Sequence, residues 1–154
     1  KGSFYHYFSS KEALMNGVLN TLHQYYKNKI FSIAHNEEMS PEERMEFFFK
    51  KQEPIFTQNL AGCLFGNITL ETIGVEEEFK TVIKAFFSDW IAAFTHIFKA
   101  DGNSEEKASA LAKESVMEIE GALMMMRVFG EVKLLRDACI SVLKKLKGAG
   151  ERKH

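Results

Sequence analysis

The sequence predicts an all-α fold. Only two of the 154 residues are proline, and no stretch shows the alternation of apolar and polar residues that is typical of a half-buried strand. Apolar residues instead recur at intervals of three or four, as they do on one face of a helix. They make up 45% of the chain and include 14 phenylalanines, which is enough for one well-buried core and excludes disorder for most of the chain.

The first long helix is expected to extend from Lys11 to about residue 35. Its apolar residues keep the spacing of one helix face: Leu14, Val18, Leu22, Tyr25, Tyr26, Ile30 and Ile33. Ser9 and Glu12 have the spacing of a capping box, which predicts that Ser9 caps this helix. At 1.5 Å per residue, about 25 residues span roughly 38 Å, so this helix can connect one end of the protein to a distant body.

The second helix has a strong start signal. Ser40 offers a capping hydroxyl, Pro41 occupies a first-turn position that needs no amide hydrogen, and Glu43 completes a capping box. The phenylalanines at 47–49 cannot all point to one side, so we expect this helix to be buried on two sides. Pro54 removes a backbone hydrogen bond and predicts a kink.

Glycines divide the rest of the chain into four more helices. The expected helices cover residues 67–73, 79–101, 105–129 and 131–147. Apolar residues cover well over half the circumference of the helix that starts at residue 79, so we expect it at the centre of the fold. Residues 148–154 form a charged, glycine-containing tail that we expect to be disordered.

Charge and cysteine usage indicate little about partners. Residues 1–36 carry four lysines against one glutamate, a charge of +3, which leaves −4 for the rest of a chain whose net charge is −1. A solvated helix face explains this asymmetry as well as a nucleic-acid partner does. Cys63 and Cys139 show no CxxC spacing and suit buried thiols in a reducing compartment. No apolar run of about 18 residues predicts a membrane span, so we expect a cytoplasmic protein.

The motifs of common enzymes are missing from the sequence. No histidine combines with another histidine, a cysteine or an acid at the spacing of a metal site such as HExxH. No GxSxG, Walker or GxGxxG motif follows a predicted strand. We therefore expect no metal site, no cofactor and no enzymatic activity.

The most specific motif is FYHYFSSKEAL, residues 4–14. It resembles the second half of the DNA-binding module of the tetracycline-repressor (TetR) family, in which a tyrosine, an aromatic or histidine, a phenylalanine and a Ser-Lys-Glu-x-Leu string follow one another. The resemblance implies that residues 1–19 are the C-terminal part of a helix-turn-helix domain, which lacks its first two helices here. Residues 20–147 would then be the effector-binding and dimerisation domain, followed by the tail at 148–154. The segment GCLFGNITLE, residues 62–71, also looks like a segment of some multidrug-type TetR regulators.

The resemblance also assigns residues to DNA and to a second subunit. Tyr5 and Lys11 would contact DNA phosphates, while Lys1, Ser3, His6 and Tyr7 would lie nearest the major groove. The last two long helices would pair with their copies in a homodimer, because their apolar faces exceed what one small body can cover. The expected interface residues are Leu111, Met125, Leu135, Ala138, Cys139, Val142 and Leu146.

We expect an effector pocket inside each subunit, where the proline and the glycine breaks prevent close packing of the helices. Its expected residues are Phe48, Gln52, Phe56, Phe65, Ile68, Phe86, Trp90, Met117, Glu120 and Met124. On composition alone, Trp90 and the methionines are more typical of a core, and Glu120 is more typical of a solvated face. The resemblance makes ligand binding a comparable alternative.

Together these expectations describe a homodimeric, ligand-responsive transcriptional regulator. It would be a repressor that leaves its operator DNA when a small hydrophobic or cationic molecule binds. The alternative is a helical small-molecule carrier or interaction module without DNA binding.

Overall fold

The computed structural model describes residues 10–72 and 77–146. Their helices, in chain order, are α2 (Lys11–Lys29), η1 (Phe31–His35), α3 (Pro41–Thr57), η2 (Gln58–Leu60), α4 (Leu64–Thr72), α5 (Glu77–Ala100), α6 (Glu105–Phe129) and α7 (Lys133–Leu143). The two η elements are short 3₁₀ turns. No strand occurs in these two ranges, so the all-α prediction is confirmed.

Helix α2 begins at Lys11, as the sequence predicted, but its cap is one residue later and its end is earlier than predicted. Ser10, not Ser9, is the cap: its hydroxyl oxygen accepts a hydrogen bond from the Ala13 amide at 3.1 Å. The α-helix ends at Lys29, and the tighter 3₁₀ turn η1 follows. In this turn Phe31 is buried, with its ring 6.1 Å from that of Phe48 in α3. Packing against α3 and α5 has therefore replaced the last turns of the expected helix.

Helix α3 starts as predicted. The Ser40 hydroxyl accepts from the Glu43 amide at 3.2 Å, and the Glu43 carboxylate accepts from the Ser40 amide at 2.7 Å. The expected burial of the phenylalanines at 47–49 is only partly correct. Phe48 is fully buried, but Phe47 is exposed, with the Lys51 ammonium 5.2 Å from its ring centre.

The break between α3 and α4 comes from the backbone around Gly62. Asn59, Leu60 and Gly62 all adopt positive φ angles, which end helical structure. Gly66 directly precedes the helix that the sequence predicted at 67–73, where glycine was expected to interrupt helical structure, but it lies inside α4. Gly74, the glycine after that expected helix, lies outside the described residues.

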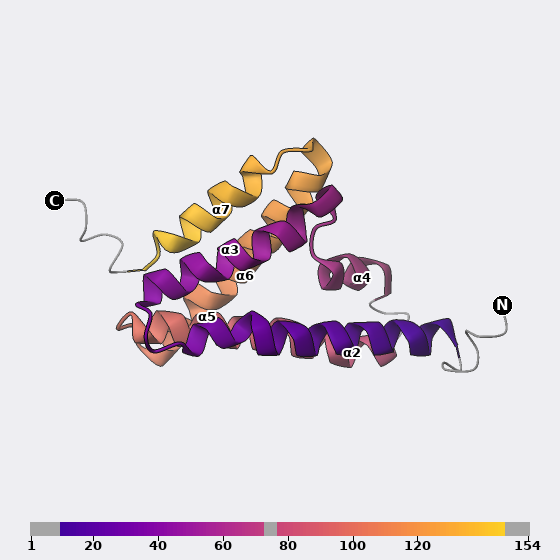
Figure 1. Cartoon of the computed structure of the whole chain (residues 1–154), viewed down its shortest axis with the longest axis horizontal. Coiled ribbons are helices and arrows are strands. Elements are labelled where there is room, and N and C mark those ends of the chain that lie inside the picture. The colour runs from indigo at the N-terminus through magenta and orange to yellow at the C-terminus, as the bar shows by residue number, and fades with distance from the viewer. Residues whose placement is uncertain (1–9, 73–76, 147–154) are drawn as a thin grey trace.

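Helix α5 is central, as expected. It contacts α2, η1, α3, α4 and α6, and α2 lies along it over most of its length (Figure 1). Its buried side chains include Phe86, Trp90 and Phe94, none of which has exposed surface. The aromatic side chains of α5 therefore form the middle of the hydrophobic core.

Helices α6 and α7 form an antiparallel pair that packs on α3 and α5 (Figure 1). The Ser104 hydroxyl caps α6, and Gly130 ends it in the left-handed conformation with φ of 71°. Helix α7 is shorter than predicted, ending at Leu143. No helix in the described part of the chain is long and apolar enough to cross a membrane.

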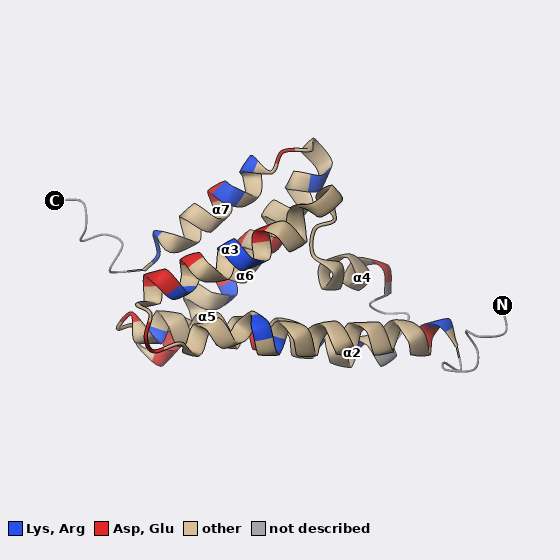
Figure 2. Ribbon diagram, in the orientation of Figure 1, with Lys and Arg blue, Asp and Glu red and all other residues tan. Residues whose placement is uncertain are grey.

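Charged residues are unevenly spread over the helices (Figure 2). In α2, no lysine, arginine, aspartate or glutamate lies between Glu12 and Lys27. Met15, Val18 and Tyr25 in this stretch are between 39% and 47% exposed. Residues 13–26 of α2 therefore carry an uncharged and partly apolar surface.

Candidate functional site

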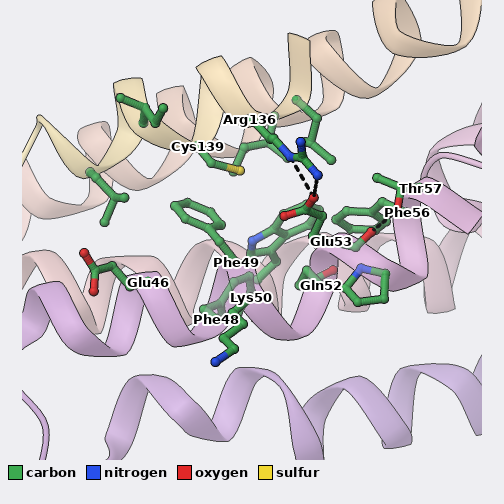
Figure 3. A pocket seen from close by; sticks show the side chains of 16 residues that line it. Glu46, Phe48, Phe49, Lys50, Gln52, Glu53, Phe56, Thr57, Arg136 and Cys139 are labelled. Atoms are coloured by element: carbon green, nitrogen blue, oxygen red, sulfur yellow. Dashed lines mark hydrogen bonds and ion pairs between the residues drawn. The ribbon is translucent and has the colours of Figure 1, made fainter. Parts of the chain in front are cut away.

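A cavity of about 600 Å³ lies between α3 and α7, with parts of α5 and α6 at its base (Figure 3). We call it the α3–α7 cavity. Most of its wall is apolar and comes from four helices: Phe48, Phe49, Phe56, Trp90, Ile119, Leu135, Ile140 and Leu143. Aromatic and aliphatic walls around a few polar groups are typical of small-molecule sites.

Two polar side chains of this cavity have no hydrogen-bond partner among the described residues. Gln52 is 2% exposed, yet neither its Oε1 nor its Nε2 is paired. The Nε1 of Trp90 is equally buried and unpaired. Each such buried group costs roughly 1–3 kcal/mol unless a partner satisfies it. A bound molecule with a hydrogen-bond donor and acceptors would remove that cost.

An ion pair spans the mouth of the α3–α7 cavity. The Nε and Nη2 of Arg136 in α7 donate to the Glu53 Oε1 in α3, at 2.8 and 2.6 Å (Figure 3). The Arg136 side chain is 63% exposed, so this pair links α3 to α7 but contributes little to stability. Nearby, burial and the negative charge of Glu53 raise the pKa of Cys139 to about 12, so this thiol is not nucleophilic at neutral pH.

A second cavity, of about 580 Å³, lies between α4 and α6, and we call it the α4–α6 cavity. Its apolar lining includes Leu70, Phe87, Leu123, Met124 and Val128. Glu120 of α6 also lines it. Burial raises the pKa of this carboxyl to about 7, although a hydrogen bond with Cys63 partly lowers it. Burial and the nearby Glu120 carboxylate raise the pKa of Cys63 well above its usual value.

The structure does not form the single pocket that the sequence predicted. Phe48, Gln52, Phe56 and Trp90 line the α3–α7 cavity, whereas Glu120 and Met124 line the α4–α6 cavity. Phe65 and Phe86 fill the space expected for a continuous pocket, because their rings stack at 3.8 Å between centroids. Ile68 is buried in the core, and Met117 is 67% exposed.

Sequence reasoning missed the contribution of α7 to the first cavity. The helix supplies Leu135, Arg136, Cys139, Ile140 and Leu143 to its wall. The sequence does contain a signal, the apolar face of the helix expected at 131–147, but the resemblance assigns that face to a partner subunit.

Burial also corrects part of the expected dimer interface. Four of its residues are buried within this chain and have at most 8% of their surface exposed: Leu135, Ala138, Val142 and Leu146. The physical reason is that α7 packs its apolar face on α3 and α6 of its own chain, which leaves little of it for a partner. Leu111 and Cys139 are half-buried, and Met125 is 44% exposed.

The expected DNA-contacting residues Lys1, Ser3, Tyr5, His6 and Tyr7 lie outside the described residues. Lys11 is the first residue of α2 and is exposed. Within residues 10–72 and 77–146, no group of three histidine, cysteine, aspartate or glutamate side chains could hold a metal ion.

Comparison with known proteins relates the chain to bacterial transcriptional regulators. The C-terminal domain model of LmrA/YxaF-like transcriptional regulators, a TetR-type domain, matches residues 41–139. The transcriptional repressor DhaR of Mycobacterium sp. (strain GP1) is 31% identical over 94 residues, which are 61% of this chain and 46% of DhaR. The repressor NemR of Escherichia coli K12 is 27% identical over 85 residues, 54% of this chain and 43% of NemR. The chain thus spans about half the length of these curated relatives.

Solved structures agree on the fold. A TetR transcriptional regulator from Legionella pneumophila superposes with a TM-score of 0.87 at 22% identity, covering 95% of this chain and 79% of that one. The reduced form of E. coli NemR gives a TM-score of 0.72 at 21% identity, covering 92% and 77%. Because the family model covers well over half of the chain, the match is not confined to one local motif. The chain belongs to the TetR family of transcriptional regulators.

Proposed function

We propose that this chain is the body of a ligand-responsive, DNA-binding regulator, a repressor that a small hydrophobic or cationic molecule releases from its operator. The observation that carries the proposal is the α3–α7 cavity, an apolar space of about 600 Å³ whose wall includes Gln52 and Trp90, two residues with unpaired buried polar groups. That volume falls within the range of roughly 300–1,000 Å³ found for small-molecule sites. The relatives DhaR and NemR, both named transcriptional repressors, support the direction of regulation.

The lining of the α3–α7 cavity indicates what its ligand looks like. The indole Nε1 of Trp90 needs an acceptor, and the Gln52 amide can both donate and accept. The surrounding wall is aromatic and aliphatic. The ligand is therefore a mainly apolar molecule with a neutral polar group, such as an amide or a carbonyl next to an N–H.

Helix α2 connects this cavity to the end of the chain that resembles a DNA-binding module. Asp89, next to Trp90 in α5, accepts a hydrogen bond from the Nε2 of His23 in α2 at 2.8 Å. Tyr26 of α2 packs edge-on against Phe86, at 5.1 Å between ring centres. A shift of α5 around a ligand would thus move α2, and with it the proposed phosphate contacts of Tyr5 and Lys11.

The free energy required for this regulation is modest. A ligand only has to prefer the arrangement that fits the operator less well. A coupling of roughly 1–3 kcal/mol lowers operator affinity about 5- to 150-fold.

The proposed regulator is a homodimer, with the exposed side of α6 at the interface between subunits. Met117, Met124 and Val128 lie along that side and are at least 50% exposed, and Ile140 of α7 is 49% exposed. A row of exposed apolar side chains on a soluble protein is typical of an interface, here with a second copy of the chain.

Trp90, the only tryptophan, allows a direct test. We expect neutral aromatic amides such as benzanilide to quench its fluorescence saturably, and Gln52→Leu to weaken that binding about tenfold through loss of hydrogen bonds to the ligand. Gln24→Leu, which changes an exposed glutamine on α2, is the matched control and should bind as the wild type does. If a panel of such amides leaves the fluorescence unchanged, or if both variants bind equally, the α3–α7 cavity is not the effector site. Ligand binding by a full-length protein that does not bind DNA would instead favour a carrier.

A further inference from the structure

The α4–α6 cavity contains a buried carboxylate that the proposed function does not use. The Oε1 of Glu120 is buried and has no hydrogen-bond partner among the described residues. The carboxylate forms a hydrogen bond with the Cys63 thiol. An isolated buried charge is costly, and folded proteins rarely keep one without a partner.

The backbone of α4 makes room for this carboxylate. A Cβ atom at Gly66 would lie 2.5 Å from the Glu120 Oε2, closer than any real contact. Gly121, one residue after Glu120, lines the same cavity, but a Cβ atom there would meet nothing within 4 Å. The close approach at Gly66 is thus specific to the carboxylate and is not a general feature of the cavity wall.

The charged and titratable groups around Glu120 do not compensate its charge. Cys63, before α4, and Tyr26, in α2, are both acids, and each has its pKa raised in part by the Glu120 charge. Phe87 is the contribution of α5 to the cavity and is uncharged. Arg127 of α6, at the edge of the cavity, is exposed and donates to the Asn67 side chain instead. The described part of the chain therefore offers Glu120 no cationic partner.

We propose that the α4–α6 cavity is a second ligand site, which binds a primary ammonium group carried on an apolar body. The Glu120 carboxylate would accept a charge-assisted hydrogen bond from the ammonium, and Phe87 and Leu123 would contact the apolar part. A divalent metal ion fits less well, because one carboxylate and one thiol are too few ligands. A neutral donor would leave the charge of the carboxylate uncompensated.

This site is separate from the α3–α7 cavity and does not depend on the proposed function. Phe86, which stacks on Phe65, contacts Phe87 of the α4–α6 cavity and Trp90 of the α3–α7 cavity, at 5.3 and 6.0 Å between ring centres. The lining sets share no residue. Binding of an ammonium here can therefore be measured whether or not a neutral ligand occupies the other cavity.

The test compares 4-phenylbutylammonium with 4-phenylbutan-1-ol, two probes of nearly equal shape that differ in charge. Isothermal titration calorimetry at pH 8, where Glu120 is mostly ionised, should show at least tenfold tighter binding of the ammonium. Glu120→Gln should weaken ammonium binding about 10- to 100-fold, as expected for a hydrogen bond to a charged group, and leave alcohol binding unchanged. Gly66→Ala should also weaken ammonium binding, because the added methyl group displaces the carboxylate.

Two variants serve as controls for position. Gly121→Ala adds a methyl group to the same cavity without a clash, and Gln52→Leu changes only the α3–α7 cavity. Both should bind the ammonium within about twofold of the wild type. Equal affinity for ammonium and alcohol, unchanged binding by Glu120→Gln, loss of binding by Gln52→Leu, or no measurable binding of the ammonium would each overturn the proposal. None of these outcomes bears on Trp90 quenching by neutral amides, so the two proposals fail independently.

Discussion

Replacement of Glu120 by glutamine should stabilise the folded chain, and the gain should depend on pH. The carboxyl group is mostly buried, and burial raises its pKa from the ordinary value of 4.5 to about 7. Glutamine has nearly the same shape and carries no charge at any pH. The variant therefore removes the cost of the buried charge and changes little of the packing around Cys63 and Gly66.

The sign and the size of the effect follow from proton linkage. Between pH 4.5 and 7 the folded chain holds a proton on Glu120 that the unfolded chain has lost, so the stability of the wild type falls as pH rises. The pKa of Glu120 is about 7 in the folded chain and 4.5 in the unfolded chain, and this difference corresponds to about 3 kcal/mol once both states are deprotonated. The stability difference between Glu120→Gln and the wild type should thus be near zero at pH 4.5 and reach about 3 kcal/mol above pH 7.

Urea denaturation of both proteins at several pH values, at one protein concentration, measures this difference. Glu118→Gln on the same helix is the matched contrast. Burial raises the pKa of Glu118, but hydrogen bonds from Lys145 and Ser141 outweigh it and lower that pKa overall. Its replacement should therefore destabilise the chain at neutral pH, and this loss should vanish in acid. A gain from Glu120→Gln that is the same at pH 5 and pH 8 would show that Glu120 is not held at a raised pKa.

Three further predictions concern Gln52, the exposed side of α6 and Lys11. Gln52→Leu should stabilise the chain without ligand by about 1–3 kcal/mol in urea denaturation, because it removes an unpaired buried amide, whereas Gln24→Leu should change stability by less than about 0.5 kcal/mol. Met117→Glu should convert a dimer to a monomer in sedimentation, since it places a charge on the exposed side of α6; a dimer of normal affinity would show that this side of α6 is not the interface. Lys11→Ala in the full-length protein should weaken binding to all DNA sequences and lower the salt slope by about one unit, and an unchanged slope would exclude a phosphate contact.

The fold was largely predictable because its signals are local. The capping box of Ser40 and Glu43 and the helix stop at Gly130 depend only on neighbouring residues, and the structure has both. The predicted end of α2 was wrong because Phe31 packs on α3 and α5, and a local sequence pattern carries no information about such contacts. Periodicity indicates that a helix face is covered, but not by what.

The same limit explains the errors at the candidate sites. The apolar face of α7 was correctly found, yet its partner is the chain itself, so Leu135 and Val142 are core residues. The aromatic residues expected to surround one pocket include Phe65 and Phe86, whose mutual stacking depends on how α4 meets α5. Gln52 and Trp90 could be named from the sequence, but their missing hydrogen-bond partners are visible only in three dimensions.

The stack of Phe65 and Phe86 also gives α2 contact with both halves of the core. Tyr26 of α2 packs edge-on against both rings, at 6.5 Å from Phe65 and 5.1 Å from Phe86. Phe86 is in turn 6.0 Å from Trp90 in the α3–α7 cavity, and Phe65 is in α4, which walls the other cavity. A tightly packed core responds to a ligand by moving whole elements, because it has little free space to absorb a local change. We therefore expect an occupant of either cavity to act on the position of α2 through the same pair of rings; under the proposed function, it would regulate DNA binding only to the extent that it prefers one position of α2 over the other.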